Sequence, residues 1–137
     1  MSTATWEDLA QYVRGEYDVI SEEADEIRIL FAFDHLDEED ERTQVIILVR
    51  EVLDEQHEWV QIASPVGLAA NVDLHALLEE VGKSSIASGA AIMGDHVVLR
   101  HSLPLATLDI HEFVEPLSLL AGTADQIEEI FFGGDNY

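Results

Sequence analysis

Branched and aromatic residues alternate with other residues over positions 27–33, and a period of two residues is the spacing of a half-buried β-strand. Similar composition predicts further strands over about residues 44–53 and 58–63. We expect Pro65 and Gly67 to end the last of these strands, because proline cannot donate to a strand ladder. The three segments would then form an antiparallel meander.

Apolar residues recur at helical spacing near the start of the chain and again over about residues 72–81. The first helix is expected to begin at Thr5, with Asp8 completing a capping box. For the second helix, Asn71 is the expected N-cap and Gly82 the expected C-terminal stop.

The last part of the chain predicts a hairpin followed by a helix. Two strands are expected over about 86–93 and 96–103, because residues 94–95 are the Gly-Asp pair typical of a two-residue turn. The final helix is expected to begin at Asp109, and Pro116 should kink or interrupt it.

The resulting order is α-β-β-β-α-β-β-α, which predicts an α+β fold with a five-stranded antiparallel sheet and three helices. A length of 137 residues suits one domain, and a hydrophobic fraction of 47% is ample for its core. We expect a single domain over residues 1–132 and a flexible C-terminal tail over residues 133–137.

The chain is strongly acidic, with 29 Asp and Glu against six Lys and Arg and a formal net charge of -23. Such a charge repels nucleic acid and anionic membranes, so neither is an expected partner. The charge fits either simple solubility or attraction to basic partners. We find no signal peptide, no span-length apolar run and no cysteine, so a cytoplasmic location is expected.

No motif concentrates catalytic or ligand-binding groups. Residues 82–85, Gly-Lys-Ser-Ser, resemble the end of a phosphate-binding loop, but Leu77 stands where that motif needs glycine. His75 and Glu79 would share a helix face, yet a zinc site needs at least three protein ligands. We therefore expect no catalytic residue, no metal and no cofactor. An enzyme or small-molecule-binding domain whose site is hidden in the sequence remains the alternative.

Both faces of the predicted sheet are apolar near its middle, whereas a half-exposed antiparallel sheet normally alternates apolar with polar residues. Helices of the same chain, a second subunit or a ligand could cover the second face. If another protein covers it, the residues that we expect to bind this partner are Leu30, Ile46, Leu48, Val60 and Ile62.

Residues 99–109, which read Leu-Arg-His-Ser-Leu-Pro-Leu-Ala-Thr-Leu-Asp, resemble the last strand and final helix start of bacterial type III secretion chaperones and the related YbjN-type proteins. Residues 69–71, Ala-Ala-Asn, are similar to the segment before the middle helix of that family. The resemblance implies a homodimeric, non-enzymatic chaperone or adaptor that holds an extended segment of another protein. YbjN-type proteins occur without a secretion apparatus, so the resemblance leaves open whether a secretion system is involved, and a regulatory role stays open as well.

Overall fold

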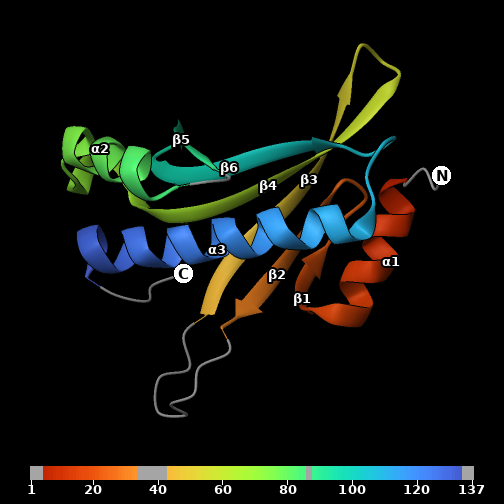
Figure 1. Cartoon of the computed structure of the whole chain (residues 1–137), viewed down its shortest axis with the longest axis horizontal. Helices are drawn as coiled ribbons and strands as arrows, with labels where there is room; N and C mark the ends of the chain where they lie inside the picture. Colours follow the sequence, from red (N-terminus) through yellow and green to blue (C-terminus); the bar gives the residue numbers. More distant parts are fainter. Residues whose placement is uncertain (1–4, 34–42, 86–87, 134–137) are drawn as a thin grey trace.

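The computed structural model describes residues 5–33, 43–85 and 88–133. Its centre is a six-stranded antiparallel sheet with the strand order β1-β2-β3-β4-β6-β5 (Figure 1). The elements are, in chain order, α1 (Trp6–Glu16), β1 (Asp18–Glu22), β2 (Glu26–Ala32), β3 (Thr43–Leu53), β4 (His57–Leu68), the 3-10 helix η1 (Ala69–Asn71), α2 (Leu74–Ser84), β5 (Gly89–Met93), β6 (His96–Pro104) and α3 (Ile110–Phe132).

The α+β class and the antiparallel sheet are confirmed, but the sheet has six strands in place of five. The additional strand is β1, whose five residues are all exposed and whose two apolar residues, Val19 and Ile20, are adjacent and so give no period-two alternation. The predicted end of β4 is also wrong, because β4 continues through Pro65 and Gly67. A register shift between these two residues absorbs the irregularity as a bulge, which is where a strand tolerates proline.

The helix ends follow local capping chemistry. Thr5 and Asp8 form the expected capping box at the start of α1. The predicted cap of α2 is wrong: Asp73, not Asn71, accepts a hydrogen bond from the backbone N–H of Ala76. Gly82 lies inside the last turn of α2 and does not end the helix.

Helix α3 begins after Asp109, as expected, and the Asp109 side chain accepts a hydrogen bond from the backbone N–H of His111. Pro116 does not interrupt the helix, which continues as one element to Phe132. Within the part of the chain that is described, no helix is long and apolar enough to span a bilayer. The start of the strand predicted at 86 and residues 134–137 of the predicted tail lie outside the described residues.

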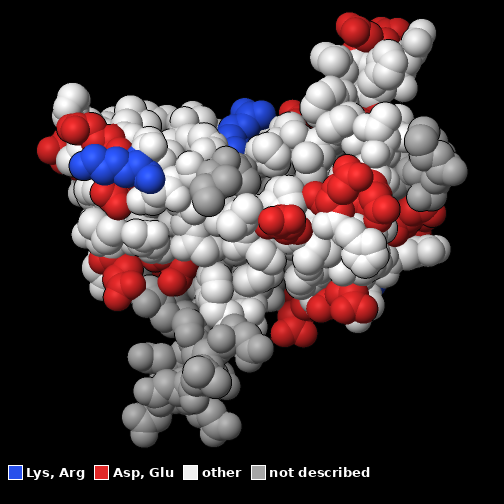
Figure 2. All heavy atoms as spheres, viewed as in Figure 1, with Lys and Arg blue, Asp and Glu red and all other residues white. Residues whose placement is uncertain are grey.

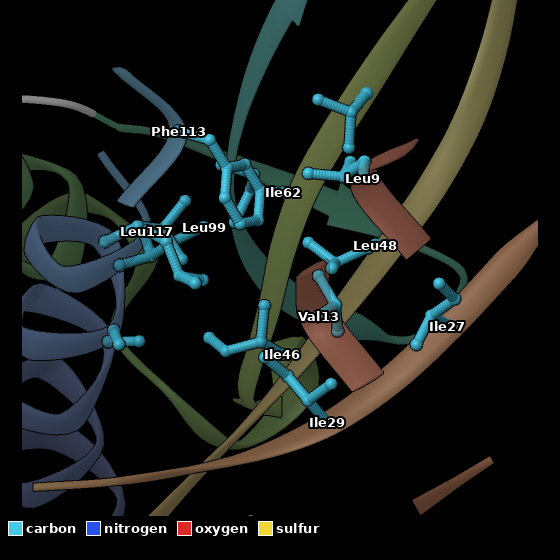
Figure 3. Close-up of a cluster of buried hydrophobic side chains, with 14 of the residues drawn as sticks. Leu9, Val13, Ile27, Ile29, Ile46, Leu48, Ile62, Leu99, Phe113 and Leu117 are labelled. Atoms are coloured by element: carbon cyan, nitrogen blue, oxygen red, sulfur yellow. The ribbon is translucent and has the colours of Figure 1, made fainter. Parts of the chain in front are cut away.

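Helices α1 and α3 pack on the same face of the sheet (Figures 1 and 3). In Figure 3, strand residues such as Ile29, Ile46 and Ile62 point toward Val13 of α1 and Phe113 of α3. All five side chains are fully buried. Burial of this one sheet face therefore builds the core. The helix-bearing side of the molecule carries acidic side chains over much of its surface (Figure 2).

Candidate functional site: the open face of the sheet

The strand residues that alternate with the core residues point to the opposite face of the sheet. On β3, Val45, Ile47 and Val49 alternate with the fully buried Ile46 and Leu48, and all three keep part of their surface accessible. We call this second surface the open face. It is lined by the strands themselves, without a helix above it among the described residues.

A hollow of about 490 Å³ runs across the open face from β2 to β5. Most of its wall is apolar, and every residue that lines it belongs to a strand. The lining residues are Glu26, Arg28, Val45, Ile47, Val49, Gln61, Ala63, Pro65, Met93, His96 and Val98. A shallow apolar hollow of this kind suits a peptide or another protein surface better than a small polar substrate.

Polar side chains at the two ends of the hollow contact each other in pairs. At the β2 end, Arg28 donates from Nε to Oε2 of Glu26 at 2.9 Å. At the β5 end, His96 Nδ1 lies 2.7 Å from Oδ1 of Asp95. The middle of the hollow is consequently an apolar strip between two polar pairs, which is the arrangement of an interface core with a polar rim.

The residues predicted to bind a partner do not lie together on this surface. Ile46, Leu48, Val60 and Ile62 are fully buried under the helices, and this placement corrects the expectation that they face a partner. Of the predicted set, Leu30 alone is on the open face, beside Val45 in the β2–β3 register.

The cause is the pairing register. Ile29 of β2 pairs with Ile46 of β3, and paired residues share one face of a sheet. Because Ile29 of β2 lies on the face that the helices cover, its partner Ile46 lies in the core. The neighbours of Ile46 in the chain, Val45 and Ile47, therefore lie on the open face. The sequence shows the apolar residues of β3, but which of them face the core can be decided only once the strand register is known.

Polar residues suited to catalysis are engaged in structural contacts. Ser64 lies on the buried face, where its hydroxyl donates to the carbonyl oxygen of Val45 at 2.8 Å and accepts from Nε2 of Gln44 at 3.0 Å. On α2, His75 Nε2 pairs with Oε1 of Glu79 at 2.8 Å, as the i,i+4 spacing predicts. Among the described residues, no three His, Asp or Glu side chains gather in a group that could hold a metal ion.

The perturbed pKa values occur away from the hollow. Partial burial raises the pKa of Tyr17, which precedes β1, to about 12. Hydrogen bonds from Arg14 lower the pKa of Glu22 and tie α1 to β1. These shifts have structural causes, and neither group lines the hollow.

A scan against models of known protein families and a search of curated proteins both found no match for this chain.

Proposed function

We propose that this protein is a non-enzymatic protein-binding domain, a chaperone or adaptor that holds an extended segment of a partner protein on the open face of its sheet. The observation that carries the proposal is the apolar strip of β3, Val45, Ile47 and Val49, over a hollow that no described helix fills. The resemblance to type III secretion chaperones and YbjN-type proteins supports the same function and a cytoplasmic location. In this proposal the role is chaperoning or regulation, with no catalytic step.

The energetic reason is the apolar area left in contact with water. Complete burial of a Val or Ile side chain is worth roughly 1.5 to 3 kcal/mol relative to full exposure. Val45, Ile47 and Val49 are each partly accessible, so a partner that covers them gains part of that free energy at every position. An extended segment suits a hollow that crosses several strands, because every second side chain of the segment can point into it.

We also propose that the protein is a homodimer. The two edge strands of the sheet, β1 and β5, differ in how well they suit the contact between subunits. Strand β1 carries Asp18 and Glu22 at its ends and a register shift within it, and both features discourage edge pairing. Strand β5 (Gly89–Met93) carries no charged residue. Two chains of charge -23 repel each other least where neither contributes an acidic group.

The proposal is tested with a displayed library of random linear peptides, selected against the purified full chain. We expect peptides with apolar residues at alternate positions, and the double substitution Ile47→Ser, Val49→Ser should abolish their binding while the protein stays folded. The matched control is Leu78→Ser on α2, since Leu78 is an exposed apolar residue (54%) outside the hollow.

Failure to select any peptide, or undiminished binding by the double variant, would overturn the proposed function. Small-molecule binding is the alternative, because Arg28, Gln61 and His96 bring polar groups to the wall of the hollow. Thermal-shift screening with a metabolite library separates the two functions. A saturable shift that the double variant loses, without peptide binding, would favour the small-molecule alternative.

A further inference from the structure

We propose that Arg100 of β6 anchors the partner segment through a carboxylate, so that the open face selects an apolar segment with an acidic side chain or a C-terminal carboxylate beside it. This inference rests on the proposed function and specifies the chemistry of its partner.

The strand register puts Arg100 on the open face. Val98, two residues earlier on β6, lines the hollow, and residues two apart on a strand share a face. Arg100 pairs with Ala63 of β4 on one side and with Gly89 of β5 on the other. Arg100 lies beside the hollow and not in its lining, and a Cβ at its neighbour Gly89 would meet no atom within 4 Å, so the surface next to Arg100 on the β5 side is open.

Arg100 differs from the other described arginines in its ion pairing. Arg14, Arg28 and Arg50 each bind at least one carboxylate. In the Arg50–Glu58 pair, for example, Nε lies 2.6 Å from Oε2. Arg100 is also partly buried, yet it forms no ion pair with a described residue. Among the four arginines that the structure describes, Arg100 is the one without a described carboxylate partner, although the chain has 29 acidic residues.

The acidic residue Glu51 shares the open face but does not neutralise Arg100. Glu51 pairs with Trp59 in the β3–β4 register, and its Oε1 accepts a hydrogen bond from Ser102 at 3.4 Å. A partly desolvated guanidinium without a partner carries a free-energy cost that an incoming carboxylate removes. The planar fork of arginine binds a carboxylate through two parallel hydrogen bonds, which fixes its orientation as well as its charge.

The overall charge of -23 opposes an acidic partner at long range, but it does not decide the contact at Arg100. At physiological ionic strength the Debye length is about 8 Å, so most of the acidic surface is screened from a ligand that lies on the open face beside Arg100. The apolar wall weakens screening of the contact itself. The net charge therefore slows the approach of acidic segments, while the local guanidinium stabilises the bound one.

The experiment uses the peptides selected on the full chain, each made in four forms: with free or amidated C-terminus, and with acidic residues kept or replaced by their amides. Binding is measured by calorimetry against the wild type, Arg100→Gln, Arg100→Lys and Lys83→Gln. Lys83→Gln is the matched control, because it makes the same change in net charge at an exposed position of α2.

We expect the carboxylate form to bind wild type more tightly, and Arg100→Gln to weaken it roughly tenfold or more, as for loss of a hydrogen-bonded charge pair. Arg100→Gln should leave the corresponding amide form unchanged, Arg100→Lys should recover part of the affinity, and Lys83→Gln should have no effect. The form that loses affinity on amidation, terminal or side-chain, identifies the source of the carboxylate.

Equal binding of carboxylate and amide forms, or equal losses in Arg100→Gln and Lys83→Gln, would overturn the role of Arg100 and leave the proposed function standing. If no peptide is selected, or if binding survives the Ile47→Ser, Val49→Ser change, both proposals fall. Circular dichroism of Arg100→Gln checks that the variant is folded.

Discussion

Gly67 of β4 lies directly against the ring of Phe132 at the end of α3, so that a Cβ at position 67 would overlap the Cδ1 and Cε1 atoms of Phe132. The contact joins the bulged part of β4 to the last turn of the helix that covers the sheet. Glycine is required there by this close approach, because only its missing side chain lets the ring reach the strand.

The first prediction is that Gly67→Ala destabilises the protein by about 1 to 3 kcal/mol, the usual cost of forcing extra volume into a packed site. Urea unfolding measures the effect. The control is Gly82→Ala in α2, where a Cβ meets no atom within 4 Å. This change should leave stability equal or raise it by up to about 1 kcal/mol, because alanine favours helix. An unchanged midpoint in Gly67→Ala would show that Phe132 moves aside at no cost.

The second prediction separates the two faces of β3. Leu48→Ala should lower the free energy of unfolding by about 2 to 5 kcal/mol, because it leaves a cavity in the core. Ile47→Ala, one residue away on the open face, should cost clearly less, since Ile47 is already partly hydrated. Urea unfolding of both variants is the measurement. Equal losses would contradict the placement of Ile47 on an open face.

The third prediction concerns alkaline pH. Burial raises the pKa of Tyr17 from 10.0 to about 12, so the folded state holds this proton more strongly than the unfolded state. The resulting stabilisation is complete below about pH 10 and is lost as the pH rises through about 12. Tyr17→Phe keeps the ring that stacks on Phe31 but removes the titration.

Stability of Tyr17→Phe should therefore fall less than that of the wild type between about pH 10 and 12. In a pH titration followed by the absorbance of ionised tyrosine, this variant should also lack the transition that occurs at the highest pH in the wild type. Parallel stability profiles for the two proteins would exclude a raised pKa at Tyr17.

The fourth prediction is a homodimer. Light scattering coupled to size exclusion should give about twice the chain mass of 15.2 kDa. Added salt should strengthen the dimer, because it screens repulsion between two acidic chains. Ile92→Lys on β5 should yield a monomer, whereas Ile20→Lys on β1 should not. Both isoleucines lie on edge strands and are similarly exposed, at 54% and 56%. A monomeric mass for the wild type at micromolar concentration would contradict the prediction.

The sequence by itself determined the class of the fold and most of its elements. Period-two alternation identified β2, a composition rich in branched apolar residues identified β3, and the Thr5–Asp8 capping box set the start of α1. Gly94, which adopts a positive φ of 66°, made the β5–β6 turn recognisable. These features depend on residues close together in the chain, so local physical chemistry specifies them. Strand β1 was missed because its two apolar residues, Val19 and Ile20, are adjacent and give no period-two alternation.

Only the tertiary structure decided which face of the sheet is open. β3 is apolar on both sides, so its pattern alone assigns neither Ile46 nor Ile47 to the core. That choice depends on the register with β2 and on the side to which α1 and α3 pack, and both involve residues far apart in the chain. Arg100 became a candidate anchor by the same means, because its small neighbours Ala63 and Gly89 meet it only through strand pairing. Burial of one apolar face by the helices leaves the other face open among the described residues.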